Sequence, residues 1–347
     1  MGKIVSEAEV YRKNKRNYFI ILIFGIVLAL FVFCASLCIG NYHTTISDVI
    51  NAILHPQENQ SVYKIITLSR LPRLLGAILV GTSLSVSGVV YQELFNNRMA
   101  SPDILGVSSG ASVGASISIY FGLGFALTGL FAFIGGVIAV VCTIFIAKLF
   151  GGTKRQTIAL VIAGIVVGGL MSSVLGLFKY LSNDAQLSSI TFWLLGGLYN
   201  TTYSQLIIAG PIIIIGVVIL MMLRWRILML RNGDFDASLH GINTKATKYT
   251  AIAIATIITA LSICISGTIG WVGLAIPNLM MLVCNNDEKR LMPLSIVYGI
   301  LFLEIADLLA RTLTNTEIPV GVITGFLGAV IFIIVIIIQK AMVRKHD

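Results

Sequence analysis

Charged residues are scarce in this chain of 347 residues. Asp, Glu, Lys and Arg together make up 11% of it and apolar residues 57%, whereas a soluble domain carries about 25% charged residues. Mean hydropathy is +0.94. These values exclude an ordinary soluble enzyme or a nucleic-acid-binding domain. The net charge of +9 reflects a shortage of acids, 15 against 24 basic residues.

Metal-binding and catalytic patterns are also missing. The five cysteines lie in apolar stretches without a paired C-x-x-C spacing, and the four histidines are scattered. Cys34 and Cys38 are one helical turn apart, which more often reflects packing than ligation. Neither an H-E-x-x-H zinc motif nor a phosphate-binding P-loop occurs. We therefore expect no metal site, no cofactor bound by this chain and no catalytic residue.

Long apolar blocks are what the chain does contain. A hydrocarbon core of about 30 Å requires about 20 helical residues per crossing. We predict an all-α polytopic membrane protein: one transmembrane domain over 1–347, with a membrane core at 18–339 and about ten spans. These spans are 18–40, 71–91, 104–121, 126–149, 157–179, 204–223, 250–268, 270–284, 292–309 and 320–339.

The distribution of basic residues predicts the orientation. With ten spans and an inner N-terminus, the inner segments hold 19 of the 24 Lys and Arg residues. The outer segments hold the other five, which are Lys64, Arg70, Arg73, Lys179 and Arg311. Because positive residues gather on the cytoplasmic side, both termini are predicted to be cytoplasmic.

Small residues are concentrated between positions 70 and 114. Such residues allow helix backbones to approach closely within a membrane bundle. Polar backbone at membrane depth is tolerated where it is buried or lines a water-filled path. We therefore predict that this stretch packs beside, or lines, a pathway. The candidate residues are Gly81, Ser85, Gly88, Gln92, Gly106, Ser108 and Gly110.

Three loops are predicted to carry short helices. The outer segment 41–69 contains an amphipathic stretch with Ser47 as the expected N-cap. The outer segment 181–200 includes another short helix, and the inner loop 224–249 carries one that starts at Asp234 and ends near Gly241.

Acidic residues near membrane depth are few. Glu93, at the inner end of the second span, is predicted to be solvated. Glu304 and Asp307 could form a coupling-ion or proton site, since an intramembrane acid is a functional candidate by default. We favour the simpler interpretation, an Asp307–Arg311 helix pair at the membrane surface that contributes a few tenths of a kcal/mol.

Three outer arginines run against the predicted charge bias. Arg70, Arg73 and Arg311 could reach lipid headgroups with their charged ends. They could instead form a docking patch for an acidic external partner. The residues alone leave both interpretations open.

Motifs in matching order over nearly the whole chain resemble the FecCD-type permeases, the membrane subunits of ABC importers for iron-siderophores, haem and cobalamin. The similar segments are R-x-P-R at 70–73, NNRMASPDILGVSSGA at 96–111, WLLGG at 193–197, the G-D-to-L-G loop at 233–241 (here ending His240-Gly241), GWVGLAIP at 270–277, A-D…R at 306–311 and EIPVG at 317–321.

The resemblance implies a transport subunit of the bacterial cytoplasmic membrane, not an enzyme. A second permease subunit, identical or paralogous, would complete the pathway. Two cytoplasmic ATPases would use ATP-Mg and couple through a helix comprising Asp234, Ala237, Leu239, His240 and Gly241. An external binding protein would deliver an iron(III)-siderophore and dock on Arg70, Arg73 and Arg311.

Alternatives and departures accompany this prediction. Haem or cobalamin is the alternative cargo, and an ion-coupled secondary transporter is the alternative class. Arg98 stands where the family usually has Pro, His240 replaces a usual Leu, and Asn278 replaces a common His. Phe332 ends a segment that lacks the usual Pro.

Overall fold

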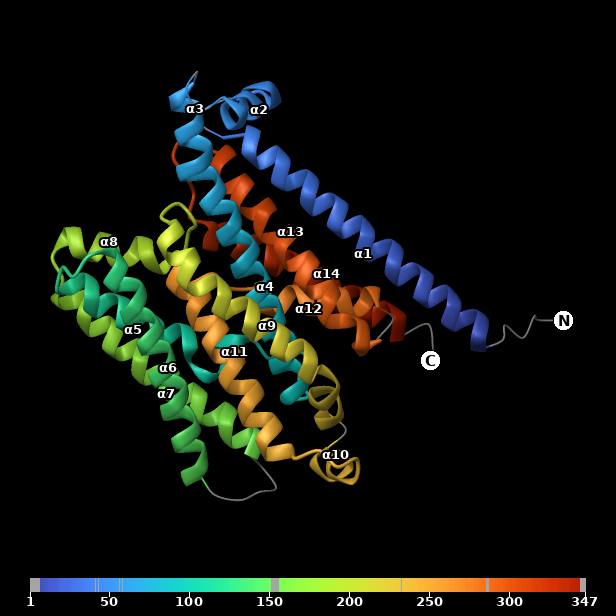
Figure 1. Cartoon of the computed structure of the whole chain (residues 1–347). Coiled ribbons are helices and arrows are strands. Elements are labelled where there is room, and N and C mark those ends of the chain that lie inside the picture. The colour runs from blue at the N-terminus through green and yellow to red at the C-terminus, as the bar shows by residue number, and fades with distance from the viewer. Residues whose placement is uncertain are drawn as a thin grey trace.

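Helices form all the regular structure in the described ranges (Figure 1). The computed structural model describes residues 7–40, 42, 44–55, 57, 59–150, 156–231, 233–284 and 287–343. The elements are α1 (Glu7–Cys38), α2 (Ile46–Leu54), α3 (Gln60–Lys64), the π-helical turn η1 (Ile65–Arg70), α4 (Leu71–Leu94), the 3₁₀ turn η2 (Pro102–Leu105), α5 (Val107–Tyr120), α6 (Phe125–Leu149), α7 (Gln156–Leu181), α8 (Asp184–Leu194), α9 (Tyr203–Arg231), α10 (Asp234–Leu239), α11 (Thr244–Ser266), α12 (Val272–Val283), η4 (Glu288–Arg290), α13 (Leu291–Thr312) and α14 (Val320–Val343).

The prediction of an all-helical membrane protein is confirmed. Among the described residues, eight helices are long and apolar enough to cross a membrane. The predicted spans 104–121 and 270–284 correspond to the shorter helices α5 and α12. The total of ten spans and the inner location of both termini remain predictions. Part of their support comes from basic residues in 1–6, 151–155 and 344–347, which lie outside the described residues.

Helix α4 occupies the centre of the bundle. It packs against α9, α11, α12 and α13, and 78% of the most apolar window in the helical run containing it is buried. The corresponding share is 17% for both α1 and α14, and 22% for α7. Those peripheral helices expose apolar side chains that require lipid or a protein partner around them.

The small residues of α4 and α5 explain this central packing. A Cβ added at Gly88 would lie 1.9 Å from the backbone oxygen of Gly273 on α12. A Cβ at Gly81 would lie 2.5 Å from the oxygen of Gly299 on α13. Gly110 on α5 meets α6 in the same way. These backbones therefore touch directly, and a side chain would force the helices apart.

A π-helical turn precedes α4, a feature that the sequence analysis did not predict. Pro72 lies at the start of α4, directly after η1. Proline lacks the N–H for an i→i−4 bond and its ring presses on the preceding turn. The wider π turn accommodates it, so the helical run continues from Gln60 to Leu94.

The short helices lie at opposite ends of the bundle: α2, α3 and α8 at one, α10 at the other (Figure 1). By the predicted topology these are the outer and inner ends. The predicted helices in 181–200 and 234–241 are present as α8 and α10. The Ser47 cap was wrong: Thr45 caps α2, because its hydroxyl accepts from the Asp48 N–H at 3.2 Å and its own N–H donates to the Asp48 carboxylate at 2.8 Å.

Candidate functional site

Five charged side chains meet at the outer end, where α1, α4 and α13 converge. We call Arg70, Arg73, Asp307, Arg311 and Glu317 the outer ion cluster. Arg73 Nε donates to Asp307 Oδ1 at 2.6 Å, and its Nη1 donates to Glu317 Oε2 at 2.8 Å. Arg311 Nε lies 3.2 Å from Asp307 Oδ2. Asp307 therefore pairs with two guanidinium groups at once.

Arg70 and Arg311 bind the end of α1 and the chain that follows it. Arg70 donates to the carbonyl oxygens of Leu37 and Tyr42, and to the Thr44 hydroxyl at 2.7 Å. Arg311 Nη1 donates to the Ile39 carbonyl at 3.2 Å. The Leu37 carbonyl lies in the last turn of α1, which ends at Cys38, and Ile39 and Tyr42 lie in the chain beyond it. The arginines therefore cap the end of α1 and hold the segment that follows it.

These positions correct one expectation. The Asp307–Arg311 pair exists, but it is buried within the protein instead of being exposed, since Asp307 is 0% exposed and Arg311 5%; its depth in the membrane remains a prediction. Arg70 and Arg73 are likewise only 5% exposed, so their charged ends do not extend to lipid headgroups. A hollow of about 490 Å³, lined by Ile39, Gly40, Arg311 and residues 312–315, reaches the cluster from outside. The docking role of the arginines remains a prediction.

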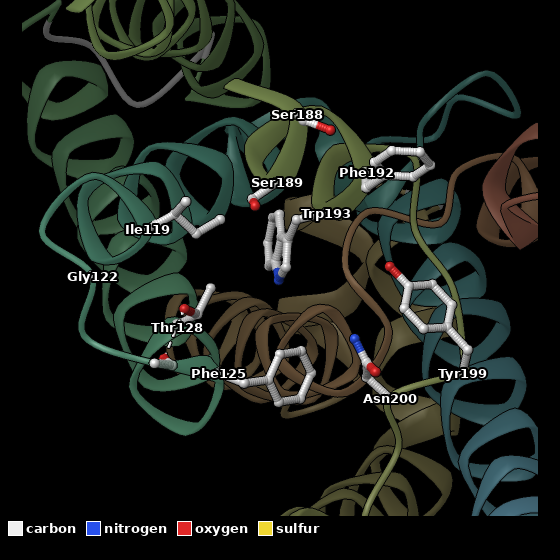
Figure 2. A pocket seen from close by; sticks show the side chains of 11 residues that line it. Ile119, Gly122, Phe125, Thr128, Ser188, Ser189, Phe192, Trp193, Tyr199 and Asn200 are labelled. Atoms are coloured by element: carbon white, nitrogen blue, oxygen red, sulfur yellow. Dashed lines mark hydrogen bonds between the residues drawn. The ribbon is translucent and has the colours of Figure 1, made fainter. Parts of the chain in front are cut away.

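A second feature of the outer end is an open cavity of about 480 Å³ beneath α8 (Figure 2). Its walls come from the end of α5, the start of α6, α8 and the loop after it. Four aromatic side chains contribute to them: Phe125, Phe192, Trp193 and Tyr199. No charged residue lines this outer cavity.

Polar groups in the outer cavity are available to a ligand. The Trp193 indole nitrogen and the Asn200 amide nitrogen point into the space between the aromatic rings (Figure 2). No hydrogen bond joins either group, or the Ser188 hydroxyl, to another described residue. Convergent polar groups between aromatic walls are the usual composition of a small-molecule site.

Backbone contacts hold α8 over this cavity. Gln186 Nε2 donates to the Tyr120 carbonyl at 2.9 Å, which fixes the start of α8 on the end of α5. Gly196 turns the chain at a φ of +67°, and a Cβ there would lie 2.4 Å from the Thr268 oxygen. The sequence analysis noted the W-L-L-G-G segment but did not predict the cavity, because its other walls come from residues about 70 positions earlier.

A smaller charged group lies at the inner end of α4. We call Glu93, Arg98 and Arg231 the inner ion cluster. Glu93 was predicted to be solvated, and this was wrong: it is 4% exposed. Arg98 Nη1 donates to Glu93 Oε1 at 3.0 Å, and Arg231 Nη1 lies 3.9 Å from Glu93 Oε2. Both arginines come from segments beside the helix end and neutralise the carboxylate.

The turn after α4 also brings together two residues that depart from the family pattern, Arg98 and Asn278. Asn278 donates to the Arg98 carbonyl at 2.8 Å and to the Leu274 carbonyl at 2.8 Å. Gln92 Nε2 lies 3.5 Å from the Gly273 carbonyl. Ser108 donates to the Asp103 carboxylate, and Gly106 ends η2 at a φ of +83°. Of the seven proposed pathway residues, six are buried within this chain and Ser108 is half-buried.

Helix α10 projects from the inner end (Figure 1) and begins three residues after Arg231 of the inner ion cluster. Ala237 is buried and anchors it, whereas Phe235 and Leu239 are 74% and 69% exposed. Asp234 pairs with Lys248 at 2.6 Å. His240 Nδ1 lies 2.9 Å from the Asp236 carbonyl, and Gly241 turns the chain at a φ of +74°. The helix thus presents two apolar side chains away from the bundle.

Comparison with known proteins shows related permeases. A putative ABC transporter permease of Methanocaldococcus jannaschii is 33% identical, covering 95% of this chain and 97% of the relative. A probable iron chelatin transport permease of Helicobacter pylori is 34% identical over 86% of this chain and 90% of its own. Further relatives at 31 to 36% identity are named as permeases for molybdate, cobalamin and hemin.

A solved structure supports the same assignment. An inward-facing putative metal-chelate type ABC transporter matches with a TM-score of 0.81 and 29% identity, covering 91% of this chain and 98% of that one. The family model of the FecCD transport family matches residues 28–338. The chain therefore belongs to the FecCD transport family and is a multi-pass ABC transporter permease of the cytoplasmic membrane.

Proposed function

We propose that this permease takes up an iron(III)-siderophore or related iron chelate, driven by ATP and delivered by an external binding protein. The outer cavity is the observation that carries the choice of cargo. Its lining is aromatic and uncharged, which suits the organic shell of a chelate. A bare oxyanion such as molybdate would find no cation there to offset its desolvation. Haem and cobalamin also have organic shells and remain the alternative cargo.

The same proposal assigns roles to the two ends. The binding protein docks over the outer ion cluster, where the hollow beside Arg311 admits an acidic side chain. At the inner end, Phe235 and Leu239 of α10 insert into an ATPase, while Asp234, Ala237, His240 and Gly241 hold the helix in place. A second permease subunit covers part of the exposed apolar surface. ATP-Mg is used by the ATPase, and this chain binds no cofactor.

Ion-coupled transport has less support. In the part of the chain that the structure describes, no three His, Cys, Asp or Glu side chains come together as a cation site. Glu304 is 1% exposed, but Asp307 is already engaged by Arg73 and Arg311. The buried acids therefore do not form a continuous relay.

Vesicle uptake tests the function. The permease is reconstituted with its ATPase and binding protein, and uptake of a ferric hydroxamate, haem, cobalamin and molybdate is compared with ATP inside. We expect ferric hydroxamate uptake that stops when the catalytic Glu of the ATPase is changed to Gln. Uptake that persists in that variant and follows a proton gradient would overturn the ABC mechanism. Faster uptake of molybdate would overturn the cargo assignment.

Fluorescence tests the outer cavity without the partners. The chain has three tryptophans, so Trp225→Phe with Trp271→Phe leaves Trp193 as the only reporter. A ferric chelate that enters the cavity should quench Trp193, because an absorbing ligand would lie against the indole ring. The matched control keeps Trp225 instead and should show no saturable quenching. Equal quenching in both proteins would remove the cavity as a binding site.

A further inference from the structure

A third cavity lies at the inner end of the bundle, and the transport proposal does not use it. It has a volume of about 560 Å³ and is formed by the end of α9, the residues after α10 and the first turns of α11. Arg226, His240, Asn243, Thr247 and Thr250 bring polar groups to its lining, and Trp225 forms part of its wall. We call it the inner cavity.

The inner cavity is suited to an anion. Arg226 lines it and has no carboxylate partner among the described residues, and no acid contributes to the lining. The nearby Asp234 is neutralised by Lys248 at 2.6 Å. An exposed guanidinium with a free hydrogen-bonding edge is a common partner of phosphate. A cation would meet repulsion there.

Thr247 supplies an independent indication of a ligand. It lines the cavity and is 6% exposed, yet its hydroxyl makes no hydrogen bond with a described residue. The rest of the side chain is packed in protein, so the hydroxyl opens toward the cavity, where a bound group could accept from it in place of water. Thr247 lies in the first turn of the 23-residue helix α11, whose N-terminal dipole favours negative charge.

The surface next to Arg226 indicates where the anion comes from. Ile215, Val218, Ile219 and Met222 precede Arg226 by 11, 8, 7 and 4 positions, so they share its face of α9. They are 59%, 52%, 38% and 78% exposed. At 1.5 Å per residue this face extends about 16 Å from Arg226, close to half of the ~30 Å hydrocarbon core. An acyl chain of one membrane leaflet fits that length.

Trp225 marks the level of the membrane surface. Its side chain is 50% exposed, and Lys289 Nζ lies 5.1 Å from the ring centroid. Tryptophan is enriched where hydrocarbon meets headgroups, and basic pockets between helices on the cytoplasmic side bind lipid headgroups. The apolar face of α9 and the polar inner cavity therefore meet at the depth of a headgroup.

We propose that the inner cavity binds the phosphate of a membrane phospholipid, whose acyl chain lies along the exposed face of α9. Arg226 pairs with the phosphate, and the Thr247 and Thr250 hydroxyls donate to it. Because His240 lines the same cavity, the bound headgroup also contacts the segment that follows α10. This lipid site is separate from the route of the cargo.

The test uses the full chain purified in detergent. Retained lipid is measured by native mass spectrometry, and thermal unfolding is followed while phosphatidylglycerol is added. We expect saturable binding with a rise in Tm, and binding roughly tenfold or more weaker in Arg226→Gln. Arg224→Gln is the matched control: it removes an exposed arginine two positions away that does not line the cavity, and it should bind like the unaltered protein.

Three further measurements identify the source of the phosphate: a neutral glycolipid, inorganic phosphate and co-purification with the ATPase. A neutral diacylglycerol glycolipid should not raise Tm, because it has the acyl chains without the phosphate. Inorganic phosphate alone should not raise it either, and an equal effect would replace the lipid with a soluble anion. Equal losses in Arg226→Gln and Arg224→Gln would overturn the site. If Arg226→Gln weakens co-purification with the ATPase and leaves lipid retention unchanged, Arg226 serves that protein contact instead.

Discussion

The two ion clusters lie at opposite ends of one helix, α4, and differ in how they are closed. In the outer ion cluster the three arginines are each 5% exposed, and Arg70 and Arg311 are bound to backbone carbonyls in the last turn of α1 and just after it. In the inner ion cluster the side chains of Arg98 and Arg231 are 31% and 32% exposed. Only Glu93 is buried there.

This difference separates a fixed end from an adjustable one. The outer ion cluster joins α1, α4 and α13 through buried contacts, and the half-exposed Glu317 adds the loop before α14. The inner ion cluster joins α4 to the last residue of α9, three positions before α10 begins. Exposed ion pairs are weak and can exchange partners with solvent. Motion of α10 can therefore alter the inner end while the outer end stays in place.

The largest expected effect is on the outer ion cluster. Asp307→Asn leaves the buried Arg311 without its paired carboxylate and leaves Arg73 with only the half-exposed Glu317, and loss of one partner of a buried ion pair costs about 3–5 kcal/mol. We expect a large fall in Tm and in the yield of monodisperse protein. Glu317→Gln is the control, because the Glu317 side chain is 37% exposed and its loss should cost less than about 1 kcal/mol. Equal stability of the two variants would mean that burial does not distinguish the acids.

The next effect concerns helix α4, which runs between the two ion clusters. Gly88→Ala places a Cβ 1.9 Å from the Gly273 oxygen, so α4 and α12 must separate, and overpacking of this kind costs about 1–3 kcal/mol. We expect a lower Tm and reduced uptake. Gly176→Ala on α7 is the matched control, since no atom lies within 4 Å of its added Cβ. There the change should be neutral or slightly stabilising.

The position of helix α4 was predicted better from the sequence than the burial of the two ion clusters. Helical spans follow from local apolar blocks, and glycines such as Gly81 and Gly88 indicate close packing without revealing which helix they touch. The partners of Arg73 are Asp307 and Glu317, more than 230 positions away in the chain, so no local pattern reveals that burial. Glu93 was misplaced in part for the same reason: Arg98 is five positions away, but Arg231 comes from another helix. The outer cavity likewise joins separate segments.

A smaller effect is expected at the buried acid of the inner end. Glu93→Gln keeps the shape and removes the charge that holds Arg98 and Arg231, at a cost of about 1 kcal/mol after screening by solvent. Tm should change little. If the inner ion cluster transmits motion between α10 and α4, uptake per ATP hydrolysed should fall, which parallel assays of both quantities measure. If uptake per ATP hydrolysed is unchanged, the inner ion cluster only neutralises Glu93 and does not transmit motion.

The smallest effect distinguishes the two ends by salt. Arg98→Gln removes a one-third-exposed partner and should cost about 0–1 kcal/mol in dilute buffer. At about 1 M salt, where the Debye length is about 3 Å, the difference in Tm between Arg98→Gln and the unaltered chain should disappear, because exposed charges are screened. The loss caused by Asp307→Asn should persist in the same buffer, since its ion pairs exclude solvent. A salt-sensitive Asp307→Asn together with a salt-insensitive Arg98→Gln would reverse the assignment of the fixed and adjustable ends.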